Sequence, residues 1–91
     1  MINLEQVKFI SIGFGSVINA NKVVAIISPE SAPIKRMITE SRQKGTLIDA
    51  TYGRKTRSVV VMDSGQIVLS LITPDTITAR MQQRNGVLEN E

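Results

Sequence analysis

The sequence of 91 residues contains no cysteine and no histidine. Without cysteine there are no disulfide bridges and no thiolate metal sites, two devices that often stabilise chains of this size. Without histidine the chain lacks the commonest general base and the commonest metal ligand. We therefore expect neither a metal site nor a cofactor.

Aromatic residues are also scarce, because only Phe9, Phe14 and Tyr52 are present. The core must be aliphatic, and a domain of this length buries only somewhat more than about 60% of its unfolded surface. Small domains without disulfides or metals often gain stability by association, so we expect a homo-oligomer.

No run approaches the roughly 18 apolar residues of a membrane span. The N-terminus has an acidic residue before its first lysine and no clean apolar segment, unlike a signal peptide, so we expect a cytoplasmic protein.

The net charge of +3 is unevenly distributed. Eight cations face three acids between Lys22 and Arg57, whereas two cations face four acids from Ser58 onward. Such an asymmetry indicates a polyanionic partner for one part of the surface.

The pattern of apolar residues predicts one small α+β domain spanning residues 1–91, with a mainly antiparallel sheet of about five strands and two helices. The continuous run Val23–Ile27 is typical of a strand buried on both faces. Asp63, Ser64 and Gly65 predict a tight hairpin turn. The predicted strands cover residues 7–12, 23–27, 46–51, 58–62 and 66–71, and the helices cover 32–44 and 74 to about 84.

The first helix has clear boundary signals. Ser31 is a suitable N-cap, Pro33 falls in the first turn, and Gly45 follows the last lysine as a C-terminal glycine. Thr73 and Pro74 give similar signals for the second helix. The tail from residue 86 onward is expected to be frayed.

Gly13, Phe14 and Gly15 follow the first predicted strand and resemble half of a dinucleotide-binding fingerprint. Ile18 occupies the third glycine position and no amphipathic helix follows, so a bulge or turn that redirects the strand explains them better. The glycines would also allow another backbone to approach closely.

Catalytic constellations are not evident. Asp49 and Asp63 could be described as paired carboxylates, but Asp63 belongs to a turn and neighbouring Arg or Thr groups could satisfy Asp49. No histidine is available to activate a serine, although composition alone leaves a Ser–Lys pair open. We expect a protein that is not an enzyme.

The segment Thr51–Val61 contains a group of cations, Arg54, Lys55 and Arg57, directly after Gly53 and before a run of valines. Guanidinium and ammonium groups beside hydroxyls are the donors that grip phosphate oxygens. Two alternatives stay open: these cations could protect an edge strand from aggregation, and the helix cations could form an ordinary solvated face. The candidate phosphate contacts beyond the three loop cations are Lys35, Arg36 and Thr56.

Duplex DNA bound through its backbone requires no exposed aromatic rings. Single-strand recognition uses exposed aromatic platforms, for which the chain has few rings. The two predicted helices lie about thirty residues apart with strands between them, so no helix–turn–helix is legible.

The phrases "ISIGFGS", "SPESAPIKR" and "GTLIDATYGRKTR" resemble the RemA family, extracellular-matrix regulatory proteins of Gram-positive bacteria. The resemblance extends from about Lys8 to Leu71. It implies a ring-forming regulator that binds double-stranded DNA without a helix–turn–helix and wraps promoter DNA around a basic rim.

Carried over residue by residue, the resemblance implies DNA-binding roles for Lys22, Arg54 and Lys55, and a structural role for Pro33 at the start of the first helix. Lys22 and Lys55 stand where the family pattern has arginine. Lysine keeps the charge but not the bidentate fork, which leaves Arg54 as the first candidate for groove contact.

The sequence therefore predicts an oligomeric DNA-binding regulator of biofilm matrix genes that bends or wraps promoter DNA. The predicted DNA contacts are Lys22, Arg54, Lys55 and Arg57, and the predicted structural positions are Pro33, Gly13, Gly15 and Gly53. The alternative is a protein-interaction module whose basic loop docks an acidic partner protein.

Overall fold

The computed structural model describes residues 7–83, which form six strands and two α-helices. Residues 84–91 lie outside this range, and with them the predicted tail. The first helix covers the predicted residues, and the second begins at Pro74 as predicted but ends at Gln82. The elements in chain order are β1 (Phe9–Gly13), β2 (Ser16–Asn19), the 3-10 helix η2 (Ala20–Lys22), β3 (Val23–Ile27), α1 (Ala32–Lys44), β4 (Leu47–Asp49), β5 (Ser58–Met62), β6 (Ile67–Ser70) and α2 (Pro74–Gln82).

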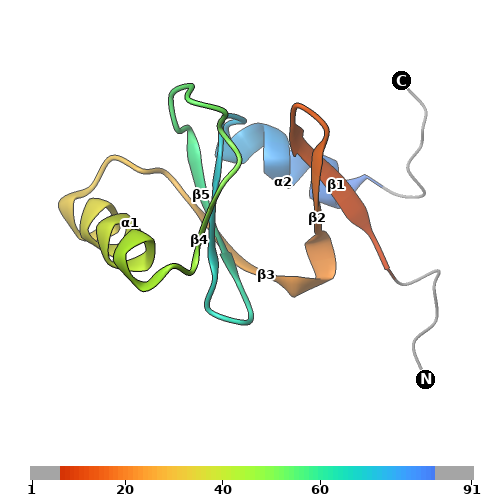
Figure 1. The fold of residues 1–91 in the computed structure, drawn as a ribbon. Coiled ribbons are helices and arrows are strands. Elements are labelled where there is room, and N and C mark those ends of the chain that lie inside the picture. Colours follow the sequence, from red (N-terminus) through yellow and green to blue (C-terminus); the bar gives the residue numbers. More distant parts are fainter. Residues whose placement is uncertain (1–6, 84–91) are drawn as a thin grey trace.

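The strands form two sheets, as Figure 1 shows. β1 and β2 pair as an antiparallel hairpin, and the other four strands form a sheet in the order β3-β5-β6-β4. The prediction of a mainly antiparallel fold is confirmed, with one exception: β4 runs parallel to β6. Since β4 pairs with β6 and not with β5, residues 50–57 must cross the end of β6 to reach the start of β5.

Side chains alternate across the four-stranded sheet and so create two apolar layers. One face of the sheet packs against α1, and the other packs against the β1–β2 hairpin and α2 (Figure 1). The α1 side contains Val59, Ile67 and Leu69, with Ile34, Met37 and Ile38 of the helix. The opposite side contains Val60, Val68, Ile10, Ile12, Ile18 and Ile77.

The helix boundaries follow from their caps. The Ser31 hydroxyl accepts a hydrogen bond from the Ile34 N–H at 3.3 Å, Pro33 lies in the first turn, and Gly45 ends α1 with a φ of 77°. Thr73 caps α2 by accepting from the Thr76 N–H at 3.3 Å. These local signals act as the sequence predicted.

The prediction that residues 23–27 are buried on both faces is wrong. β3 is an edge strand that pairs only with β5 in this sheet, and its residue Val24 is 67% exposed. A central position in the sheet therefore does not explain the apolar composition of β3. Among the helices of residues 7–83, none is long and apolar enough to cross a bilayer.

Candidate nucleic-acid interface

Residues 50–57 form the loop that carries the three clustered cations. Its first residue, Ala50, donates its N–H to the Leu69 carbonyl at 3.0 Å, and its last, Arg57, donates to the Ser70 carbonyl at 2.8 Å. Both ends of the loop are thus fixed to the C-terminal end of β6. The segment between them projects past this end of the sheet (Figure 1). Arg54 and Lys55 belong to the projecting segment, and Arg57 lies at its end.

The tip of the loop is a tight turn from Thr51 to Arg54. The Arg54 N–H donates to the Thr51 carbonyl at 3.0 Å, and both central residues have positive φ, 56° at Tyr52 and 79° at Gly53. Two positive φ values are typical of a type I′ turn. Gly53 adopts the positive φ that glycine tolerates, whereas Tyr52 occupies a conformation that side chains rarely adopt.

Asp49 fixes the start of the loop. Its Oδ1 accepts hydrogen bonds from the Thr51 hydroxyl at 2.6 Å and from the Thr51 N–H at 3.0 Å. These two bonds, together with the Arg42 guanidinium at 4.0 Å, lower the pKa of the Asp49 carboxyl below its usual value, against an opposing effect of burial. The Thr51 hydroxyl is buried and committed to this contact, so it is not a phosphate donor.

The loop cations are exposed. Within residues 7–83 neither Arg54, Lys55 nor Arg57 forms an ion pair, while Thr56 is half-buried. The loop leads into β5, which has β3 on one side and β6 on the other. The interpretation that these cations protect an edge strand therefore fails, because the strand they precede is central.

A second tight turn packs against the first. β1 and β2 are joined through Phe14 and Gly15, whose φ values of 51° and 80° again indicate type I′, and the register shifts between Ser11 and Gly13. The predicted bulge or turn at Gly13–Gly15 is confirmed. A Cβ on Gly13 would lie 3.2 Å from Leu71, so the glycine permits a close approach of the hairpin to the chain that follows β6.

The two turns bring two of the three aromatic rings together beside a cation. The rings of Phe14 and Tyr52 are 5.5 Å apart at an angle of 88°, and the Arg54 guanidinium carbon lies 5.0 Å from the centre of the Phe14 ring. The hydroxyls of Ser16 and Tyr52 are 3.4 Å apart. Sequence reasoning missed this cluster, because the glycine after each ring marks a turn but does not show that the two turns meet.

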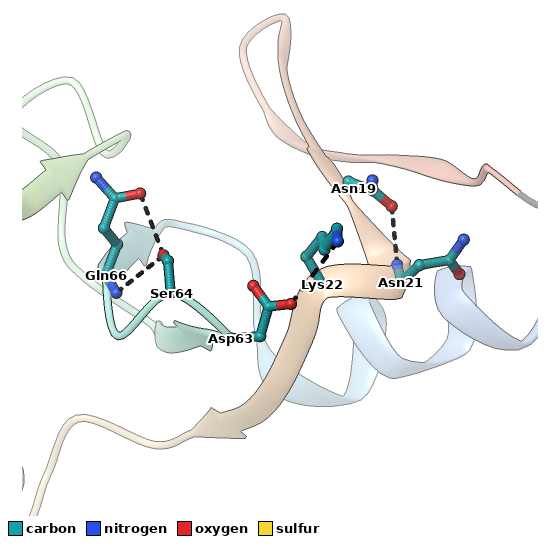
Figure 2. Close-up of polar contacts among 6 residues, drawn as sticks. All are labelled: Asn19, Asn21, Lys22, Asp63, Ser64 and Gln66. Atoms are coloured by element: carbon teal, nitrogen blue, oxygen red, sulfur yellow. Dashed lines mark hydrogen bonds and ion pairs between the residues drawn. The ribbon is translucent and has the colours of Figure 1, made fainter. Parts of the chain in front are cut away.

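Lys22 lies at the other end of the sheet. Its Nζ is 3.9 Å from Asp63 Oδ2 (Figure 2). The Lys22 carbonyl also accepts a hydrogen bond from the Asp63 N–H at 2.8 Å. β5 separates Asp63 from Arg57, so Lys22 is roughly 20 Å from the loop at about 3.3 Å per strand residue. Within a single chain, Lys22 therefore does not lie near Arg54 and Lys55.

The remaining candidates lie near the loop end of the sheet. Lys35 and Arg36 are exposed in the first turns of α1, which begins shortly after β3 ends beside the start of β5. Asp49 and Asp63, by contrast, lie at opposite ends of the four-stranded sheet, and each has its own cation. They do not form a carboxylate pair.

The fold and the exposed cations define a small single-domain α+β protein with a projecting basic loop. Residues 9–81 match the family model described as extracellular matrix regulatory protein A-like, and the chain belongs to this RemA-like family. Extracellular matrix regulatory protein A of Bacillus subtilis is 54% identical over 83 residues, which cover 91% of this chain and 93% of the relative. A regulatory protein of Carboxydothermus hydrogenoformans is 53% identical over 85 residues, 93% of this chain and 98% of the relative. A regulatory protein of Crocosphaera subtropica is 57% identical over 77 residues, which cover 85% of this chain and 86% of the relative. The names of these relatives support a regulatory role.

Proposed function

We propose that the chain is a transcriptional regulator that binds double-stranded DNA through the loop of residues 50–57 and bends or wraps it. By its family, the regulated genes would include those of the biofilm matrix. The observation that carries the proposal is the exposed group Arg54, Lys55 and Arg57, which has no acidic partner within residues 7–83. Cations without partners are available to replace counterions on a phosphate backbone.

The geometry argues for action by several copies. A single loop offers only a few phosphate contacts, and Lys22 is too far away to join them. Repetition of the loop around a closed homo-oligomer would convert weak contacts into strong binding, provided that the duplex follows the curvature. Because backbone contacts carry little sequence information, selectivity would come mainly from DNA shape and deformability.

The exposed edge of β3 supports association with a second copy. Val24 is 67% exposed, and residues 23–26 line an open, largely apolar groove of about 470 Å³ with Thr78, Met81 and Gln82 of α2. An apolar strand edge of this kind favours pairing with another chain. A Val24→Lys variant should therefore lower the molar mass measured by light scattering.

DNA binding is tested by titrating a labelled duplex at several salt concentrations. The logarithm of the affinity should fall with the logarithm of salt at a slope of about −0.9 per phosphate contact. Arg54→Ala should abolish binding near physiological salt, leave weaker binding at low salt, and reduce the slope. The matched control is Lys44→Ala, which removes an exposed cation from the last turn of α1 and should bind almost as the wild type does.

Three results would contradict the proposal. A folded, oligomeric Arg54→Ala protein that binds normally would exclude the loop. Absence of any duplex binding at low salt would favour an acidic protein partner. Stronger competition by unlabelled structured RNA than by duplex DNA would point to RNA.

A further inference from the structure

The contact between the two tight turns is the feature that the proposed charge-based binding does not explain. Phosphate contact requires cations, yet two of the three aromatic residues of the chain are presented beside the first loop cation. Phe14 is 54% exposed and Tyr52 is 64% exposed. Rings that remain more than half exposed contribute little to the core, so burial does not account for their position.

The backbone conformation of Phe14 and of Tyr52 is energetically unfavourable. Phe14 and Tyr52 are the two non-glycine residues with positive φ within residues 7–83. Each is followed by a glycine with nothing near its Cβ position, and glycine or asparagine would fit the first central position of such turns better. Strained conformations of this kind persist at functional sites when a side chain is needed there.

The position of Arg54 indicates why an aromatic ring is placed at these turns. Its guanidinium carbon is 5.0 Å from the centre of the Phe14 ring, within the range of a cation–π contact, and the ring of Tyr52 meets Phe14 at 88°. An arginine at the tip of an exposed loop otherwise samples many rotamers, and ordering it on binding costs entropy. A ring that restricts the guanidinium beforehand reduces this cost.

We infer that Phe14 is a positioning residue for Arg54: its ring, braced by Tyr52, holds the guanidinium ready to contact a nucleic-acid phosphate. The inference rests on the proposed DNA binding, and it assigns a role to the β1–β2 turn, which carries no charge of its own. It also explains why the two turns meet. The hairpin supplies the ring, and the loop of residues 50–57 supplies the cation.

The role of the ring is tested by three substitutions at the same position. Phe14→Leu keeps an apolar side chain and the positive φ but removes the π face, whereas Phe14→Trp retains and strengthens it. Leu should weaken duplex binding about two- to fivefold per contacted chain, and Trp should restore it. Phe14→Ala should behave as Leu does. A leucine variant that binds as the wild type does would overturn the inference.

A double-mutant cycle separates positioning from an independent contact. At low salt, where all variants bind, Phe14→Leu should have no further effect in an Arg54→Ala protein but its full effect in a Lys55→Ala protein. Additive effects of Phe14→Leu and Arg54→Ala would overturn the inference, because the ring would then act without the guanidinium.

A measurement on the free protein distinguishes failure of this inference from failure of DNA binding. The side-chain protons of Arg54 should show an upfield ring-current shift by NMR in the wild type and in Phe14→Trp, lost in Phe14→Leu. If no duplex binds but this shift is present, the proposed function fails while the positioning contact stands. If the duplex binds and the shift is absent, the positioning role fails alone.

Discussion

The hydroxyl of Ser70 offers a direct test of how the hairpin is held on the sheet. Ser70 is fully buried, and its Oγ donates to the Ile12 carbonyl at 2.9 Å and accepts the Ile72 N–H at 3.0 Å. Ser70→Ala removes the partner of both backbone groups. An unsatisfied buried group costs about 1–3 kcal/mol. We take about 2–4 kcal/mol for the pair, because Ile72 is only half-buried and water can partly replace its bond.

Chemical denaturation followed by circular dichroism measures this loss directly. Unfolding should be compared at one protein concentration, since association stabilises the folded state. For a domain of this size the corresponding fall in melting temperature is at least about 10 °C. Ser64→Ala, in the exposed turn after β5, is the matched control and should remain within about 0.5 kcal/mol of the wild type. A Ser70→Ala protein as stable as this control would refute the reasoning.

Two further perturbations test the site. The lowered pKa of Asp49 means that its carboxylate stabilises the folded chain above the unfolded pKa of about 3.9, and that this contribution is lost as pH falls through the folded pKa. Asp49→Asn should therefore flatten the decline in stability measured below about pH 4, and an unchanged acid profile would contradict the assignment. Gly13→Ala should destabilise more than Gly15→Ala in thermal unfolding, because both have positive φ but only a Cβ on Gly13 would meet Leu71, at 3.2 Å. Equal losses would show that backbone strain alone matters.

Local signals account for most of what could be predicted from the sequence. α1 was predictable because Ser31, Pro33 and Gly45 act on the residues beside them, and the hairpin turn at Gly65 was predictable for the same reason. The misjudged strand, Val23–Ile27, shows the limit. Its apolar run is compatible with a central strand, and only the pairing order places it at an edge.

The charged part of the site was predictable and the aromatic part was not. Arg54, Lys55 and Arg57 are close in sequence, so their clustering needs no knowledge of the fold. The contact of Phe14 with Arg54 joins segments 40 positions apart through two strained turns, and propensity argues against a ring at either position. Rules based on local conformational preference cannot predict backbone strain that is maintained by tertiary packing.

The parallel pairing of β4 with β6, which the sequence did not predict, is what creates the display of charge. Had β4 formed a hairpin with β5, a turn of two or three residues would have sufficed, and the cations would have lain along paired strands. Parallel pairing places the ends of β4 and β6 on the same side, so the chain must pass over β6 before β5 begins. The crossing fixes Ala50 and Arg57 to the β6 backbone and leaves the residues between them to project. The β1–β2 turn lies at the same end of β6, because Gly13 closely approaches Leu71. The parallel pairing of β4 with β6 therefore places Arg54 beside the ring of Phe14.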